Sequence, residues 1–227
     1  MKTVGILGGM GPEATILLMQ KVLAAVPARD DADHVPLLVH QNPQVPSRIR
    51  ALIQGGGEDP GPVLAHMARD LEAGGAQALA MPCNTAHHYG PAIRAATDLP
   101  FLDMLDLTAA HLAQSGARRI GMLASPATRL AGVFEAPFAD RGLTPVFLED
   151  DTALLAIIRA VKAGAPLGAL RPRLRNEAEV LLSQGADHLL VACTELSLMT
   201  DSLPTEYRHH TDSLDCLTRA IVDFAKG

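Results

Sequence analysis

Two cysteines of this sequence occupy matching positions in an internal repeat. The segments 75–84 (GAQALAMPCN) and 185–194 (GADHLLVACT) align at a constant spacing of 110 residues, which places Cys83 over Cys193. Each cysteine ends an apolar run, and polar residues follow it directly. A thiol at the end of a buried strand, beside polar side chains, is a candidate acid, base or nucleophile.

The expected position of these thiols favours proton transfer. In α/β sheets, ligands bind beyond the carboxyl ends of the strands. A thiol that also lies at a helix N-terminus is close to free backbone N–H groups and to the positive end of the helix dipole, which lower its pKa from about 8.5. Two such thiols, one from each copy of the repeat, would face each other across a cleft. One would remove a proton from a carbon atom while the other delivers a proton to the opposite face.

The elements that must position these thiols alternate along the chain. Apolar runs that are typical of buried parallel strands occur at 4–7, 36–40, 78–82, 101–104, 119–124, 145–148 and 188–192. Helical patterns, several of which end in a glycine turn, occur at 14–25, 62–73, 107–115, 152–163, 171–184 and 214–225. This alternation predicts an α/β protein with mostly parallel sheets flanked by helices.

The repeat divides the chain into two pseudo-symmetric α/β domains. We expect the first to comprise residues 1–100 plus 212–227, and the second to comprise residues 101–211. The chain would first cross between the domains within 99–118 and return within 204–212. No long linker is visible, so the two domains are expected to pack against each other with the active-site cleft between them.

The composition excludes several functional classes. A chain of 227 residues that is 48% hydrophobic and 19% charged is not disordered. Its net charge of −6 and the lack of a basic stripe argue against nucleic-acid binding. No apolar run reaches the roughly 18 residues of a membrane span, and the first residues do not resemble a signal peptide. We therefore expect a cytoplasmic protein without membrane association.

Other candidate residues have simpler interpretations. The three cysteines form no Cys-x-x-Cys pair, which argues against a disulfide framework or a zinc site, and Cys216 is interpreted as structural. The adjacent histidines at 87–88 and 209–210 would point apart, so we interpret them as helix-cap or surface residues rather than metal ligands. The glycines within 8–11 lack dinucleotide-loop spacing. They are interpreted as a tight turn that presents backbone N–H groups to a carboxylate.

Three motifs together resemble the aspartate/glutamate racemase family. They are residues 8–15 (GGMGPEAT), 81–87 (MPCNTAH) and 193–196 (CTEL), and the resemblance extends to Asp212-Ser213 near the end of the chain. Cys-Thr-Glu, where Cys-Thr-His would be expected in cell-wall glutamate racemases, points to the aspartate racemase branch. The resemblance implies two α/β domains, amino-acid racemisation without pyridoxal phosphate or any other cofactor, no metal, and a homodimer.

The resemblance also implies roles for individual residues. Cys83 and Cys193 would be the opposed acid and base. Arg48 would hold a substrate carboxylate by a forked contact, and Lys162, which precedes a glycine turn, would contact the substrate. The complete substrate-binding set that it implies is Met10, Gly11, Arg48, Asn84, Thr85, Ser125, Thr128, Lys162, Thr194 and Glu195.

Some positions depart from the family pattern. Ser47 stands where the family usually has Asp, residues 125–128 read SPAT where Thr-x-x-Thr is common, and Phe134 replaces a common Tyr. None of these changes removes a thiol, but together they leave the identity of the substrate side chain open.

The function predicted from the sequence is racemisation of a dicarboxylic amino acid. Aspartate is the first choice and glutamate the second, with Arg48 pairing with the side-chain carboxylate. The alternatives within the superfamily are a hydantoin racemase, a racemase of another amino acid, and a maleate isomerase that uses one cysteine as nucleophile. A non-catalytic alternative is a dicarboxylate-binding sensor.

Overall fold

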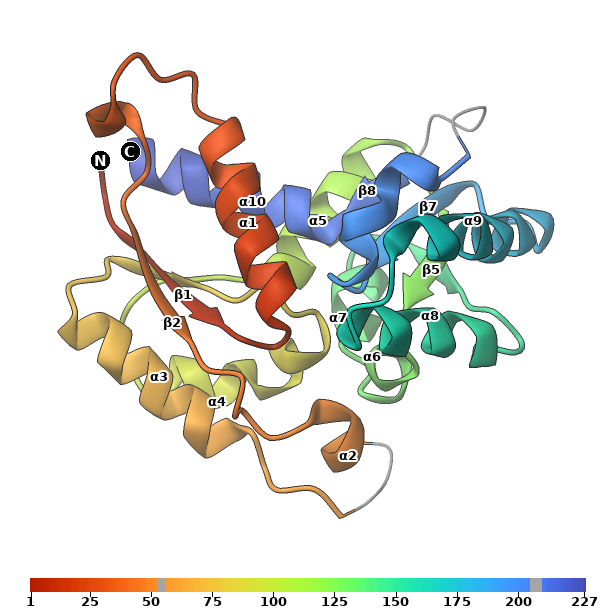
Figure 1. Ribbon diagram of the computed structural model, residues 1–227, viewed down its shortest axis with the longest axis horizontal. Coiled ribbons are helices and arrows are strands. Elements are labelled where there is room, and N and C mark those ends of the chain that lie inside the picture. Colours follow the sequence, from red (N-terminus) through yellow and green to blue (C-terminus); the bar gives the residue numbers. More distant parts are fainter. Residues whose placement is uncertain (53–55, 205–209) are drawn as a thin grey trace.

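Two parallel sheets, each with four strands among the described residues, form the framework of the molecule (Figure 1). The computed structural model describes residues 1–52, 56–204 and 210–227. The first sheet has the strand order β2-β1-β3-β4 and consists of β1 (Val4–Gly8), β2 (Leu37–Gln41), β3 (Ala78–Ala80) and β4 (Phe101–Leu102). The second has the equivalent order β6-β5-β7-β8 and consists of β5 (Arg119–Ala124), β6 (Thr144–Val146), β7 (His188–Ala192) and β8 (His210–Asp212).

Helices cover both faces of the first sheet. Val4 and Ile6 of β1 pack against α1 and the C-terminal helix α10, whereas Leu7 packs on the opposite face against α3. This alternation follows from the two-residue period of a strand. The helical segments of this unit are α1 (Pro12–Ala24), η1 (Asp31–Asp33), α2 (Arg48–Leu52), α3 (Gly61–Ala73), η2 (Thr85–Tyr89), α4 (Gly90–Arg94) and α10 (Ser213–Lys226).

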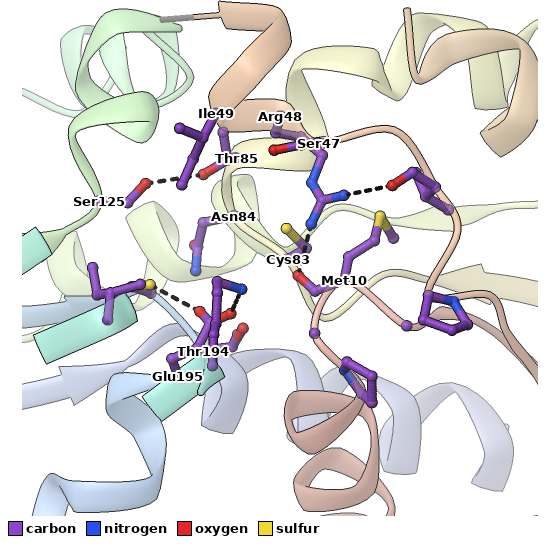
Figure 2. A pocket seen from close by; sticks show the side chains of 18 of the residues that line it. Met10, Ser47, Arg48, Ile49, Cys83, Asn84, Thr85, Ser125, Thr194 and Glu195 are labelled. Atoms are coloured by element: carbon purple, nitrogen blue, oxygen red, sulfur yellow. Dashed lines mark hydrogen bonds and ion pairs between the residues drawn. The ribbon is translucent and has the colours of Figure 1, made fainter. Parts of the chain in front are cut away.

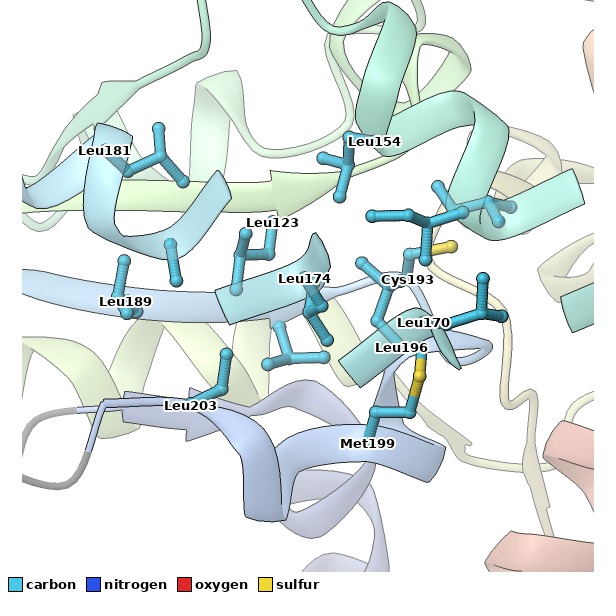
Figure 3. Close-up of a cluster of buried hydrophobic side chains, with 14 of the residues drawn as sticks. Leu123, Leu154, Leu170, Leu174, Leu181, Leu189, Cys193, Leu196, Met199 and Leu203 are labelled. Carbon is cyan, nitrogen blue, oxygen red and sulfur yellow. The ribbon is translucent and has the colours of Figure 1, made fainter. Parts of the chain in front are cut away.

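The second sheet is buried in the same way. Figure 3 shows Leu123 of β5 and Leu189 of β7 in the apolar cluster formed with α8, α9 and η3. On the other face, Ile120 and Met122 of β5 pack with buried residues of α5 and with Phe138 of α7. The helical segments here are α5 (Met104–Gln114), α6 (Pro126–Leu130), α7 (Glu135–Ala139), α8 (Thr152–Lys162), α9 (Leu167–Ser183) and η3 (Leu196–Ser202).

Equivalent glycines show that the sequence repeat is also a structural repeat. A Cβ atom on Gly5 of β1 would lie 2.9 Å from the Cβ of Ala76, and one on Gly121 of β5 would lie 3.0 Å from the Cβ of Ala186. Ala76 and Ala186 are themselves matched at the spacing of 110 residues. A contact this short excludes a side chain, so each unit needs glycine where its first strand meets the turn before its third.

The predicted α/β class with two domains is confirmed, but the predicted domain bounds at 100/101 and 211/212 do not coincide with the limits of the two sheets. Residues 101–102 form β4, which pairs with β3, so they belong to the first sheet rather than the second. Asp212 is the last residue of β8 in the second sheet rather than the start of the returning segment. Part of the predicted return, residues 205–209, lies outside the described residues. The rest of the proposed domain division stays a prediction.

The element predictions differ from the structure mainly at element ends. The helix expected from residue 107 begins at Met104, because the Asp103 carboxylate caps it by accepting hydrogen bonds from the backbone N–H groups of Leu105 and Asp106. The short, partly polar strand β8 was not predicted. No helix within the described ranges is long and apolar enough to cross a membrane.

Candidate active site

The two units meet at a cavity of about 600 Å³ that the repeated cysteines line (Figure 2). Cys83 follows β3 by three residues and Cys193 follows β7 directly, so both lie beyond the carboxyl ends of equivalent strands. They are 8% and 7% exposed, respectively. The sequence placed a thiol from each unit at one cleft, and the structure brings both thiols to this cavity.

Almost all of the predicted site residues line this cavity. Besides the two cysteines, the predicted lining residues are Met10, Gly11, Arg48, Asn84, Thr85, Ser125, Lys162, Thr194 and Glu195. Thr128 is the exception, since it is not among the lining residues. Its hydroxyl lies 2.8 Å from that of Thr85 and 3.2 Å from that of Ser125. Thr128 therefore supports two hydroxyl groups of the cavity wall, one from each unit.

Arg48 reaches into the cavity with part of its hydrogen-bonding capacity already used. Nη1 donates to the main-chain carbonyls of Val45 and Pro46 at 3.3 and 3.0 Å, and Nη2 donates to the carbonyl of Met10 at 3.2 Å. These bonds hold the segment before α2 against the turn before α1. Of the five N–H groups of a guanidinium, the Nε–H and one Nη2–H have no partner among the described residues.

Each cysteine loop is linked to the opposite unit by polar contacts, one through the Ser213 hydroxyl and one directly. The Asn84 amide nitrogen donates to Ser213 Oγ at 3.0 Å, and that hydroxyl donates to the carbonyl of Val191 at 3.0 Å. In the other direction, the Thr194 hydroxyl donates to the carbonyl of Pro82 at 3.3 Å. The Asn84 Oδ1 atom is buried and has no hydrogen-bond partner among the residues that the structure describes. Because buried acceptors are normally satisfied, this oxygen is available to a ligand that donates hydrogen bonds.

Cys193 lies in a charged cluster formed by residues of the second unit. Its thiol donates to Glu195 Oε2 at 3.0 Å, and Glu195 Oε1 accepts from the Lys162 ammonium group. Burial raises the pKa of Cys193 well above its usual value, the charge of Glu195 raises it further, and Lys162 partly opposes this. For Lys162, burial acts to lower the pKa, but the Glu195 carboxylate outweighs burial and the pKa is raised.

Cys83 has different surroundings. His87 does not contact its sulfur. Instead, His87 Nδ1 lies 2.8 Å from the Cys83 carbonyl, and His87 Nε2 accepts the backbone N–H of Met104 at 3.2 Å. The proton is therefore on Nδ1, which donates to the carbonyl. Burial lowers the pKa of His87, so this imidazole is a neutral group that positions the Cys83 loop, and both of its nitrogens are occupied.

The turn before α1 forms one wall of the cavity because a glycine allows a close approach. Gly9 has φ of +95°, and a Cβ there would lie 2.4 Å from the carbonyl carbon of Asn42. Its N–H donates to Thr15 Oγ1 at 2.9 Å. The sequence-based interpretation as a tight turn is confirmed, while a role for its N–H groups in binding a carboxylate stays a prediction.

Sequence analysis missed several lining residues. Glu13 lies in the first turn of α1, and Val45, Ile49 and Ile158 add apolar surface. Ile158 precedes Lys162 by one helical turn, so the two share a face of α8, and this spacing could have identified it. Glu13 belongs to the 8–15 motif, but its carboxylate carried no separate signal. Among the described residues, no cluster of three or more His, Cys, Asp or Glu side chains could hold a metal ion.

Two α/β units with matching strand orders and a shared polar cavity define the fold class of the known two-domain racemases. The chain superimposes on the aspartate racemase of Picrophilus torridus with a TM-score of 0.85 and 29% identity, covering 100% of this chain and 95% of the other. A profile of the Asp/Glu/hydantoin racemase family matches residues 7–221. The chain therefore belongs to this family and is an isomerase, an amino-acid racemase.

Two further relatives extend the comparison. The broad specificity amino-acid racemase RacX of Bacillus subtilis (strain 168) is 26% identical over 227 aligned positions, which cover 96% of each chain. An aspartate racemase homologue from Pyrococcus horikoshii OT3 shares the fold with a TM-score of 0.79 at 22% identity, covering all of both chains. These relatives differ in the substrate range that their names state.

Proposed function

We propose that this racemase acts on aspartate, and secondarily on glutamate, by proton transfer between Cys83 and Cys193. The observation that carries the proposal is that each unit of the repeat contributes one thiol to the same cavity. One thiolate takes the α-proton, the C–H electron pair remains on the α-carbon, and the second thiol gives its proton to the opposite face. The reverse reaction exchanges the two roles.

Polar groups of the cavity support a single orientation of the substrate. The unpaired Asn84 Oδ1 is an acceptor suited to the α-ammonium group. The hydroxyls of Thr85 and Ser125 are donors suited to the α-carboxylate, where negative charge increases as the α-proton leaves. The two remaining N–H groups of Arg48 match the two oxygens of a side-chain carboxylate. We propose that Arg48 selects dicarboxylic substrates in this way.

The experiment is isotope exchange and racemisation in deuterium oxide. The purified protein is incubated separately with L-aspartate and L-glutamate under reducing conditions, and α-deuterium uptake and the D-enantiomer are measured. We expect both signals, larger for aspartate. If high enzyme concentrations give neither signal with either amino acid, the substrate assignment is wrong.

Serine variants test the mechanism. Because each thiol is needed in each direction, Cys83→Ser and Cys193→Ser are expected to lose racemisation, by at least the roughly 10²-fold that a positioned acid or base contributes. Cys216→Ser is the matched control: this third cysteine is buried in α10, away from the cavity, and Arg219 donates to its sulfur at 3.2 Å. Full activity of either cavity variant would contradict the two-thiol mechanism.

A racemase of broader substrate range is the second candidate. Arg48 already uses three N–H groups on main-chain carbonyls, and Met10, Val45, Ile49 and Ile158 give the cavity apolar surface. A curated relative of similar length is a broad specificity amino-acid racemase. A panel of neutral L-amino acids in the same exchange assay separates the two: turnover of leucine or methionine at rates equal to aspartate would favour the broader function.

The remaining expectations concern cofactor, assembly and location. We propose that the reaction needs no pyridoxal phosphate, so activity is expected to survive hydroxylamine, which captures that cofactor. The homodimer that the family resemblance implies is tested by light scattering during size-exclusion chromatography. Cytoplasmic location is tested by cell fractionation.

A further inference from the structure

The two thiols of the cavity have the same exposure but unequal electrostatic surroundings. Cys83 and Cys193 are 8% and 7% exposed, so a small reagent has similar access to each. Among the described residues, a carboxylate lies within hydrogen-bond distance of Cys193 alone of the two, with Glu195 Oε2 at 3.0 Å. In the described part of the chain, no side-chain acceptor lies within hydrogen-bond distance of Cys83 Sγ. The internal repeat therefore holds the two sulfurs in equivalent places and gives them different neighbours.

Glu195 favours the protonated form of Cys193. A thiolate and a carboxylate 3.0 Å apart would repel each other strongly in a site with little water. A thiol in the same place donates a hydrogen bond. Lys162 binds the other oxygen of Glu195, which fixes the orientation of this carboxylate toward Cys193.

The groups that face Cys193 from the neighbouring elements act in the same direction. Figure 3 shows its side chain among Leu170 and Leu196, in the apolar cluster under the cavity. This burial disfavours a thiolate, and Glu195 adds to the effect. Lys162 is the cation that opposes both, but it is within electrostatic range of both sulfurs. It therefore does not favour one thiol in the way that Glu195 does.

We propose that Glu195 is a positioning residue that keeps the proton on Cys193 in the free enzyme, so that Cys83 is the base of the resting state. The assignment rests on the proposed two-thiol function. In the first half of a turnover, the Cys83 thiolate forms an S–H bond with the α-proton, and the Cys193 S–H bond breaks as its proton joins the opposite face. The product leaves Cys83 as a thiol and Cys193 as a thiolate beside Glu195. Of the two protonation states of the enzyme without substrate, this one is less stable. Proton exchange with solvent restores the Cys83 thiolate and the Cys193 thiol.

The measurement is the pH dependence of thiol modification without substrate. The wild-type protein is treated with limiting methyl methanethiosulfonate between pH 6 and pH 10, and initial rates at each cysteine are read by peptide mass spectrometry. Because the thiolate is the reacting form, we expect Cys83 to react first at neutral pH, and the Cys193 rate to rise only at higher pH. Modification of Cys193 at a rate equal to or above that of Cys83 at neutral pH would overturn the proposal.

Glu195→Gln tests the residue directly. Removing the anion while Lys162 remains is expected to lower the Cys193 midpoint by about one pH unit or more. Tenfold more thiolate, offset by its lower nucleophilicity, gives roughly a threefold faster reaction at neutral pH. The modification rate at Cys83 is expected to change less than that at Cys193. Glu13→Gln is the matched control, since it removes a carboxylate of the same cavity that has no hydrogen bond to either thiol. An unchanged Cys193 midpoint in Glu195→Gln would overturn the role of Glu195.

Failure of this proposal can be distinguished from failure of the proposed function, because thiol modification and racemisation are measured separately. If Glu195→Gln does not fold, as judged by circular dichroism, the order of reaction in the wild-type protein still decides. Racemisation together with a reversed order of reaction would contradict only the assignment of Cys83 as the resting base. The expected order in a protein that racemises no amino acid would support the electrostatic assignment and contradict the proposed function.

Discussion

At the scale of single residues, the same side chain serves the fold and the site. Arg48 lines the cavity and donates to three main-chain carbonyls, which leaves two N–H groups without a partner among the described residues. His87 uses one nitrogen on the Cys83 loop and the other on the first turn of α5. Such residues cannot be assigned to structure or function alone, and a variant at either position affects both.

Arg48→Lys tests whether substrate binding depends on the paired N–H groups of the guanidinium or only on its positive charge. A lysine keeps one positive charge, but its three N–H donors are too few for the three main-chain carbonyls and the two carboxylate oxygens that Arg48 would bind. The loss of a hydrogen bond to a charged group, about 1.5–3 kcal/mol, predicts a rise of roughly 10–100-fold in the KM for aspartate. Steady-state kinetics with aspartate measures it. Arg50→Lys is the control, since Arg50 is exposed on the same short helix and does not line the cavity. Equal effects of the two variants would argue against a substrate contact by Arg48.

The residues of the site were predictable because short motifs carry them, whereas their pairings were not. The three motifs at 8–15, 81–87 and 193–196 contain eight of the eleven predicted residues that line the cavity. The contact of Lys162 with Glu195 joins α8 to the loop after β7, 33 positions further along the chain. Its formation depends on how these elements pack, which no local pattern expresses. Thr128 was misplaced for the same reason, because its distance from the cavity depends on the neighbouring Thr85 and Ser125.

At the scale of elements, glycines decide how closely a turn approaches its neighbours. Gly9 and Gly75 both have φ of +95°, a conformation that L-residues rarely adopt. Only Gly9 also lies against another backbone segment, that of Asn42. The pair therefore separates the cost of the backbone angle from the cost of the close contact.

Gly9→Ala is expected to destabilise the protein more than Gly75→Ala. At Gly75 a Cβ meets no atom within 4 Å, so the cost is the backbone term of about 1–2 kcal/mol. At Gly9 the Cβ would lie 2.4 Å from the Asn42 backbone, and the chain after β2 must move as well. Urea unfolding of the two variants measures the difference. Equal losses of unfolding free energy would mean that the contact with Asn42 has no energetic consequence.

Strands and helices were predictable to the extent that their pattern is local. Buried strands such as β5 and β7 have continuous apolar runs, and the glycine turns mark helix ends. The edge strand β8 has the sequence His210-Thr211-Asp212, and its only signal is pairing with β7. The start of α5 was displaced because the capping role of Asp103 was not recognised from the sequence.

At the scale of the whole molecule, the chain crosses between the units twice. The buried residue Asp212 lies at the second crossing. Asp212 ends β8 and caps α10: its Oδ1 accepts from Ser197 Oγ at 2.8 Å and from the Leu214 N–H at 2.9 Å. Lys21 of α1 lies 3.7 Å from Oδ2. Residues of four elements, η3, β8, α10 and α1, thus meet where the chain leaves the second sheet for the first unit.

The protonation of Asp212 is expected to make stability depend on pH. Burial raises its pKa to about 6, against about 3.9 in an unfolded chain. The folded protein therefore binds this proton more tightly, and the stabilisation is fully present below about pH 4. It is lost as the pH rises to about 6, a change on the order of 3 kcal/mol in the free energy of unfolding.

Asp212→Asn cannot ionise, so it is expected to lose this part of the pH dependence. Urea unfolding between pH 4 and pH 7 measures it, with the difference from the wild type largest near neutral pH. Asp223→Asn is the control, an exposed carboxylate on the same helix, and is expected to keep the wild-type profile. A profile of Asp212→Asn parallel to that of the wild type would mean that Asp212 does not cause the effect.

The cross-unit bonds of Asn84 and Thr194 also constrain how the molecule can move. Thr194 binds the Pro82 carbonyl of the first unit directly, and Asn84 is linked to Val191 of the second unit through the Ser213 hydroxyl. The rim of the cavity is different, since α2 of the first unit touches α6 of the second there and carries the partly exposed Arg48 and Ile49. A relative motion of the two units should therefore pivot near the bonds of Asn84 and Thr194 and widen the opening of the cavity beside α2 and α6. Entry of substrate and exit of product would then leave the spacing between the two sulfurs unchanged.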